Sequence, residues 1–235
     1  MIKYLLWDID STILDFVQAE DAAMKSGFRK FGIEIRDPDA ISNYGLINDK
    51  YWERLERGEI DRQEVLHGRF REFFDSYKIS YDDSLVADFN LFYQTELGNH
   101  IFFNPHAKET VEKLAKDYKQ YAVTNGSKIA QNLKLSKSGL DQIFDGVFIS
   151  EDLGVDKPYK EFFDKVFDEV GSKNRDEYII IGDSLTSDIR GGNNAGIRTI
   201  WYNQYGKENN ERVTIDYTID NLADIPAIIK EINKN

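Results

Sequence analysis

Cysteine is absent from the 235 residues, and basic residues are outnumbered by acidic ones. A chain without cysteine forms no disulfide, no thiolate metal site and no cysteine nucleophile. The formal net charge of −12 disfavours DNA, RNA and anionic membranes as partners, because each of these requires a basic surface. The same charge would repel a phosphate substrate, so a phosphate site in this chain needs a metal ion or a well-placed lysine.

Long hydrophobic runs are absent as well. The N-terminal apolar run at residues 4–7 stops at Asp8, which makes it too short for a signal-peptide core or a membrane span. We therefore expect a cytoplasmic protein, and the sequence leaves open whether it is a monomer or a homodimer. A hydrophobic content of 41% with 31% charged residues is that of an ordinary globular chain.

Short apolar runs recur along the chain and are typical of strands that are buried on both faces of a parallel sheet. They lie at residues 4–7, 121–123, 147–149, 178–181, 199–202 and, more weakly, 217–219. From Asn104-Pro105 onward, helical patterns alternate with these runs, at 159–170 and about 224–233 among others. This alternation predicts an α/β fold with a doubly wound, Rossmann-like and mostly parallel sheet.

Residues 16–103 differ from the rest because they contain helical patterns and no convincing strand. Four helices are predicted, at about 17–31, 39–57, 62–77 and 84–98. The chain thus leaves the sheet after its first strand and returns nearly 90 residues later. We predict an inserted all-helical cap domain at 16–103, with residues 1–15 and 104–235 forming the catalytic α/β core.

Polar clusters follow four of the predicted strands, at the sheet edge where open α/β sheets bind ligands. Asp8 and Asp10 follow the first strand with an i, i+2 spacing. Residues 124–127 (Thr-Asn-Gly-Ser) follow the second and open a helix, an arrangement that favours an anion. Each cluster alone is explained equally well by turn formation or helix capping.

Two further clusters complete the set. Lys157, in the run Asp-Lys-Pro at 156–158, brings a cation near a strand exit, and Asp183 and Asp188 follow the most apolar strand. Carboxylates gathered without a cation repel one another, by roughly 4 kcal/mol for two charges 4 Å apart at an effective dielectric near 20. Oxygen ligands of this kind suit Mg²⁺, so we predict a magnesium site among these acids.

The four clusters resemble, in order and spacing, the four motifs of the haloacid dehalogenase superfamily, and the resemblance covers the whole chain including the cap. Within that superfamily, residues 139–158 and 182–196 are similar to the noncanonical pyrimidine nucleotidases, which are 5′-nucleotidases. Ser11 stands where the superfamily most often has glycine. We expect this departure to alter the local turn without removing activity.

The resemblance implies that Asp8 attacks phosphorus and forms an aspartyl-phosphate that water then hydrolyses. It implies that Asp10 protonates the leaving oxygen and later takes a proton from the attacking water. Hydrolytic dehalogenases of the superfamily share the nucleophile and do not need the second acid. Asp10 therefore favours a phosphatase.

The remaining roles implied by the resemblance concern binding. Lys157 would contribute to catalysis and, with Thr124 and the Asn125 backbone N–H, bind the substrate phosphate. The expected Mg²⁺ ligands are the Asp8 carboxylate, the Asp10 backbone carbonyl and Asp183, with Asp188 bound to the ion directly or through its waters.

The favoured function is hydrolysis of small phosphate monoesters, with nucleoside 5′-monophosphates as the preferred candidates. A phosphatase acting on phosphoglycolate or sugar phosphates is the main alternative, as is a phosphomutase. A 2-haloacid dehalogenase and a non-catalytic phospho-switch are less favoured alternatives. Many aromatic residues fall in the predicted cap, and their helical spacing indicates packing in its interior more than contact with a base.

Overall fold

The computed structural model describes residues 1–234; Asn235, the last residue of the expected core segment 104–235, lies outside the described part. Six parallel strands form one sheet in the order β3-β2-β1-β4-β5-β6, which confirms the doubly wound α/β fold. The strands are β1 (Tyr4–Trp7), β2 (Lys119–Thr124), β3 (Gly146–Ile149), β4 (Tyr178–Gly182), β5 (Arg198–Tyr202) and β6 (Tyr217–Ile219).

Ten α-helices accompany the sheet in residues 1–234, together with short 3₁₀ turns and one π-helical turn, η3 (Leu185–Ile189). The helices are α1 (Phe16–Phe31), α2 (Ala40–Glu56), α3 (Arg62–Ser76), α4 (Asp83–Asn99), α5 (Ala107–Leu114), α6 (Lys128–Ser138), α7 (Ser150–Leu153), α8 (Lys160–Val170), α9 (Arg190–Ala195) and α10 (Ile225–Ile232). None of these helices combines the length and the apolar character that crossing a membrane requires.

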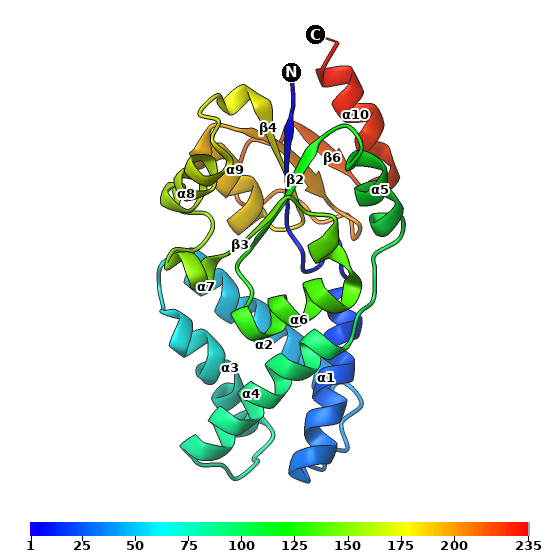
Figure 1. Ribbon diagram of the computed structural model, residues 1–235. Helices are drawn as coiled ribbons and strands as arrows, with labels where there is room; N and C mark the ends of the chain where they lie inside the picture. The colour runs from blue at the N-terminus through cyan, green and yellow to red at the C-terminus, as the bar shows by residue number, and fades with distance from the viewer. Residues whose placement is uncertain (235) are drawn as a thin grey trace.

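Alternate residues of each inner strand face opposite layers of helices. Leu5 and Trp7 pack with α5, α6 and α10 on one face, whereas Leu6 packs with α8 and α9 on the other. Figure 1 shows α5 and α10 on one side of the sheet and α8 and α9 on the opposite side. Val147 departs from the expectation of burial on both faces: it is 38% exposed, because β3 is an edge strand.

The predicted helix start at Asn104-Pro105 is two residues too early, since α5 begins at Ala107. Asn104 instead uses its side-chain amide to donate hydrogen bonds to the carbonyl oxygens of Ser11 and Thr12, at 3.1 and 2.9 Å. These hydrogen bonds join the loop after β1 to the segment in which the chain returns from the cap to the sheet.

The four helices α1–α4 form the cap, as the sequence predicts, although the exact limits at 16 and 103 stay a prediction. Side chains of Asp15, Asp61 and Asp82 accept hydrogen bonds from the first turns of α1, α3 and α4, so each helix begins at an aspartate cap. Aromatic side chains fill the interior between the helices and contact one another; those with no exposed surface are Tyr44, Phe70, Phe73, Phe74, Phe89 and Tyr93.

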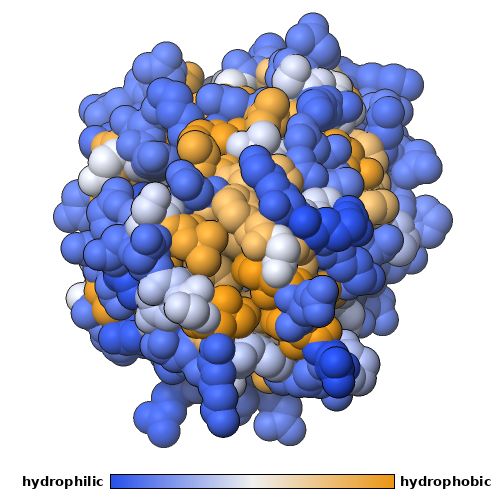
Figure 2. Space-filling model, turned by 90° about the horizontal axis from the view of Figure 1, so that it is seen from below, coloured by the Kyte–Doolittle hydropathy of each residue, from blue (hydrophilic) through white to orange (hydrophobic). Residues whose placement is uncertain are grey.

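The cap lies beyond one end of the sheet, and both termini lie at the other end (Figure 1). Helix α4 approaches α6 of the core closely, because a side chain at Gly98 would place its Cβ 2.4 Å from Leu133 Cβ. Seen from the cap end, apolar side chains gather in the middle of the surface between hydrophilic margins (Figure 2). The carboxyl ends of the strands face the cap, because residues that follow the strands line one cavity together with cap residues.

Candidate active site

A cavity of about 700 Å³ lies between the cap and the carboxyl ends of the strands. All seven residues that the sequence assigns to the site line it: Asp8, Asp10, Thr124, Asn125, Lys157, Asp183 and Asp188. The structure therefore brings the four sequence motifs together in one place.

Three of the four expected acids form a compact group. Carboxylate oxygens of Asp8, Asp183 and Asp188 lie within 4.8 Å of one another. Burial, reinforced by the Asp188 charge, raises the pKa of Asp183 to about 7. Burial also raises the pKa of Asp8, against the opposing effect of Lys157. Carboxylate oxygens this close, with raised pKa values, are a donor set that fits Mg²⁺.

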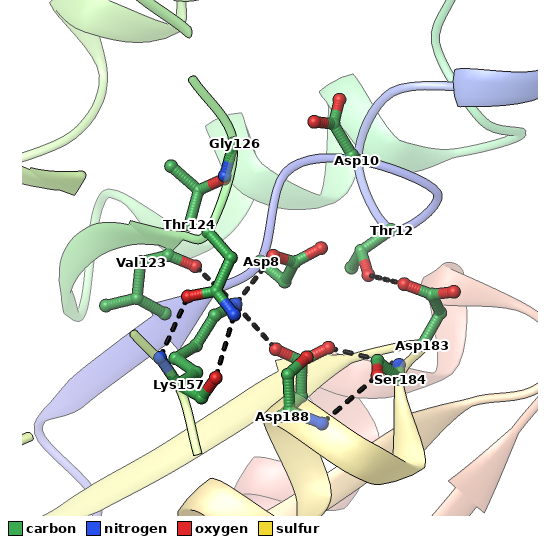
Figure 3. A network of polar contacts seen from close by, with 12 residues as sticks. Asp8, Asp10, Thr12, Val123, Thr124, Gly126, Lys157, Asp183, Ser184 and Asp188 are labelled. Carbon is green, nitrogen blue, oxygen red and sulfur yellow. Dashed lines mark hydrogen bonds and ion pairs between the residues drawn. The ribbon is translucent and has the colours of Figure 1, made fainter. Parts of the chain in front are cut away.

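Lys157 supplies the positive charge next to this group (Figure 3). Its ammonium nitrogen lies 2.7 Å from Asp8 Oδ1 and 2.6 Å from Asp188 Oδ1, and it also donates to the Val123 carbonyl oxygen at 2.8 Å. Burial by itself would lower the pKa of Lys157, yet the Asp188 and Asp8 carboxylates outweigh burial and raise that pKa. Lys157 is therefore a buried, permanently charged link between two motifs.

Asn125 positions Lys157 through two hydrogen bonds. Its side-chain Nδ2 donates to the Lys157 carbonyl oxygen, and the Lys157 backbone N–H donates to Asn125 Oδ1, both at 2.8 Å. The side chain is thus committed to the protein, which is consistent with the assignment of the Asn125 backbone N–H to an anion. Thr124 Oγ1 accepts the N–H of Gly126 at 3.1 Å.

Glycine is required at two places in these motifs. A Cβ on Gly182, at the end of β4, would lie 2.2 Å from Asp188 Oδ2, and a Cβ on Gly126 would lie 2.0 Å from Gln131 Nε2. The absence of a side chain at Gly182 leaves room for the Asp188 carboxylate, and its absence at Gly126 leaves room for the Gln131 side chain. Each glycine therefore leaves the space that a neighbouring side chain occupies.

The backbone conformation of Ser11 explains why the superfamily favours glycine at this position. Its φ of 61° is in the left-handed region, where a residue with a Cβ is strained by about 1–2 kcal/mol. The turn after β1 is kept by the hydrogen bond from the Ser11 N–H to the Leu14 carbonyl oxygen at 2.8 Å. Serine at this position therefore strains the turn, because its Cβ is disfavoured in the left-handed conformation.

Asp10 has partners that the sequence analysis missed. Its carboxylate forms an ion pair with Lys134 and accepts a hydrogen bond from Gln131 Nε2 at 2.7 Å. In Figure 3 the Asp10 side chain points away from the acidic group around Asp8. Lys134 and Gln131 are three residues apart on α6, directly after the Thr-Asn-Gly-Ser motif, so their shared helix face is a signal that the sequence did contain.

Arg62 of the cap contacts both core loops that carry the residues predicted to bind phosphate. Its guanidinium donates to the Asn125 carbonyl oxygen at 3.0 Å and to Ser150 Oγ at 2.5 Å, and it forms an ion pair with Asp156. Both core loops are thereby joined to the first turn of α3. No local pattern in the sequence marks Arg62 for this contact.

Replacement of Arg62 by methionine should lower the free energy of unfolding by about 1–3 kcal/mol, because three acceptors lose a charged donor in a largely buried place. Urea denaturation followed by circular dichroism measures the change. Arg57→Met is the matched control: its ion pair with Glu211 also joins cap to core, at 2.9 Å, but the Arg57 side chain is 41% exposed. That variant should lose less than about 1 kcal/mol. Equal losses in the two variants would contradict the importance of Arg62.

Known proteins are similar to this chain over most of its length. A family model described as haloacid dehalogenase-like hydrolase matches residues 2–196. The pyrimidine 5′-nucleotidase PynA of Streptococcus pneumoniae is 36% identical over 225 residues, which cover 95% of this chain and 93% of PynA. A glyceraldehyde 3-phosphate phosphatase of Pyrococcus furiosus is 28% identical and covers 99% of this chain, with 95% of its own length matched.

A solved structure is similar over nearly the whole fold. The putative HAD-hydrolase YfnB from Bacillus subtilis, in an orthorhombic crystal form bound to magnesium, superposes with a TM-score of 0.89 at 34% identity. The match covers 97% of this chain and 98% of YfnB. That structure is described as revealing interdomain movement.

Proposed function

Because this chain belongs to the haloacid dehalogenase-like hydrolase family, we propose that it is a magnesium-dependent phosphatase that hydrolyses nucleoside 5′-monophosphates. The observation that carries the proposal is the buried Asp8 carboxylate, ion-paired with Lys157 at 2.7 Å and adjacent to Asp183 and Asp188. A nucleophile, a fixed cation and an acidic group thus meet at the wall of a cavity that opens toward the cap.

The metal would be held by the carboxylates of Asp8, Asp183 and Asp188, with the Asp10 backbone carbonyl as a further ligand. The geometry supports this assignment, because three carboxylates lie within 4.8 Å of one another and the buried Lys157 ammonium carries only one positive charge. When bound, Mg²⁺ supplies positive charge that reduces the repulsion between the Asp8 carboxylate and the substrate phosphate.

In the proposed reaction an Asp8 oxygen forms a bond to phosphorus, and the bond from phosphorus to the ester oxygen breaks. The leaving oxygen takes a proton from the Asp10 carboxyl group, which for this step must be protonated and released from its ion pair with Lys134. Water then attacks the aspartyl-phosphate, Asp10 takes the water's proton, and phosphate is released. The contacts of Asp10 with Lys134 and Gln131 turn its carboxylate away from Asp8. Proton transfer therefore requires the Asp10 side chain to rotate within the same cavity.

Nucleotides are favoured as substrates by the similarity to PynA along nearly the full length of both chains. The cavity volume of about 700 Å³ is within the usual range for sites that enclose a small molecule. A phosphatase for small sugar phosphates is the second candidate, favoured by the similarity to the glyceraldehyde 3-phosphate phosphatase of Pyrococcus furiosus.

A panel of phosphate monoesters assayed with Mg²⁺ tests the proposal. We expect the highest kcat/KM for nucleoside 5′-monophosphates, compared with glyceraldehyde 3-phosphate, phosphoglycolate and ribose 5-phosphate. Chelation with EDTA should reduce phosphate release to background, and excess Mg²⁺ should restore it. A higher kcat/KM for the triose phosphate would favour the second candidate. Release of halide from a 2-haloacid without any phosphate release would contradict a phosphatase.

A further inference from the structure

The cavity extends past the acidic group into the cap, where it meets buried polar side chains that the proposed reaction does not use. Each cap helix contributes one: Glu20 from α1, Asn48 from α2, Arg69 from α3 and Gln94 from α4. Each is at most 6% exposed, and all four line the cavity. We call these four residues the cap polar cluster.

Arg69 is the charged centre of this cluster. Its guanidinium donates to Asn48 Oδ1 at 2.6 Å and to Asn90 Oδ1 at 3.2 Å, so both partners are neutral amides. Its Nε has no hydrogen-bond partner among residues 1–234. A buried donor left without a partner costs about 1–3 kcal/mol, so a ligand that offers an acceptor oxygen would relieve a real penalty here.

Glu20 and Gln94 add both hydrogen-bond donors and hydrogen-bond acceptors to the cluster. Glu20 Oε1 accepts from the Tyr93 hydroxyl at 2.9 Å, which orients the carboxyl group, and burial raises the pKa of Glu20 to about 7. The Gln94 carboxamide carries two N–H donors and one acceptor oxygen. Gln94 and Arg69 line the same cavity, so its cap side offers both donors and an acceptor.

The rest of the cap wall is apolar and partly flat. Phe16, Trp52, Leu66 and Leu97 line the same cavity, and Trp52 Nε1 donates to Asn48 Oδ1 at 3.2 Å. That hydrogen bond holds the indole ring next to the cap polar cluster. Apolar walls with a few fixed polar groups suit a planar heterocycle, whereas a small sugar phosphate would need a polar partner for each of its hydroxyls.

We propose that the cap polar cluster binds the base of the substrate, with Arg69 and Gln94 hydrogen-bonding the carbonyl and N–H edge of a pyrimidine ring. The inference rests on the proposed function, since the phosphate of the same molecule must lie at Asp8. Uracil presents two carbonyl oxygens on either side of a ring N–H, which complements the donors and the acceptor of this wall. Adenine has no carbonyl oxygen to accept from Arg69.

The test compares two substrates in the Mg²⁺-loaded enzyme: UMP, and p-nitrophenyl phosphate, which carries no base. The measured quantity is the ratio of their kcat/KM values. Arg69→Met and Gln94→Leu should each reduce this ratio about 10- to 100-fold, the range expected for one hydrogen bond to a charged or buried partner. The loss should lie mainly in the KM for UMP. Uridine should inhibit wild-type hydrolysis of p-nitrophenyl phosphate competitively, and this inhibition should weaken in both variants.

Arg71→Met is the matched control, because Arg71 is on the same helix as Arg69 but its side chain is 40% exposed and pairs with Asp83 at the surface. Its ratio should equal that of the wild type. Arg69→Met removes hydrogen bonds to α2 and α4 and could prevent folding, which circular dichroism would show. In that case the Gln94→Leu variant alone tests whether the cap polar cluster binds the base. A wild-type ratio in every folded variant overturns the inference. A wild-type enzyme that hydrolyses other phosphates and no nucleotide refutes the proposed substrate itself, and this is seen before any variant is made.

Discussion

An Asp8→Asn variant should release phosphate from any substrate at least about 10⁴-fold more slowly than the wild type. The neutral amide is a poor nucleophile, and no aspartyl-phosphate forms on it. The variant should nevertheless fold. Asp8 is buried beside Asp183 and Asp188, and burial raises its pKa, so the change removes one of three crowded negative charges. Lys157 does not lose its charge balance, because it still pairs with Asp188 at 2.6 Å. We expect the metal-free Tm to equal or exceed that of the wild type.

Steady-state phosphate release and thermal unfolding in EDTA measure the two effects separately. Asp141→Asn, a change of the same kind at an exposed position, serves as the control and should leave both activity and Tm unaltered. Activity of Asp8→Asn within tenfold of the wild type would contradict the assignment of the nucleophile. A fall of several degrees in the metal-free Tm would contradict the account of charge crowding around Asp8.

Replacement of Lys157 by methionine should affect both stability and rate. The variant leaves the Asp8 and Asp188 carboxylates buried without the ammonium group that contacts each of them. Loss of one partner from a buried ion pair costs about 3–5 kcal/mol in unfolding free energy. Because we propose that the same ammonium contacts the substrate phosphate, we also expect kcat to fall by about 10²–10³-fold.

Urea denaturation with and without Mg²⁺ tests the stability part. The loss should be largest in EDTA and smaller with Mg²⁺, because a divalent cation held by the same carboxylates replaces part of the missing charge. Lys160→Met is the control: Lys160 pairs with Asp164 one helical turn away, but its side chain is 56% exposed, so less than about 1 kcal/mol should be lost. A metal-free loss below 1 kcal/mol in Lys157→Met would show that the buried ion pairs are not needed for stability.

Much of the fold was predictable because its signals are local. Strands such as Tyr178–Gly182 are continuous apolar runs, since a parallel sheet buries both of their faces. The cap helices were predictable from the helical spacing of their apolar residues, as in α3 and α4. The gathering of Asp8, Thr124, Lys157 and Asp183 was also predictable, because the carboxyl ends of parallel strands meet at one edge.

Local patterns in the sequence were therefore enough to predict the sheet, the helical cap and the set of residues at the strand ends. Three contacts become visible only in the folded chain: Asn125 bonds the backbone of Lys157, Asp10 pairs with Lys134, and Arg69 lines the cavity from the cap. The sequence does not predict these contacts, because its structural signals act only between residues that are close along the chain. Periodicity and capping act over a few residues, whereas Asp10 and Lys134 are 124 positions apart and meet only when the core packs. Arg62 and Asp156 are 94 positions apart and meet only when the cap packs on the core.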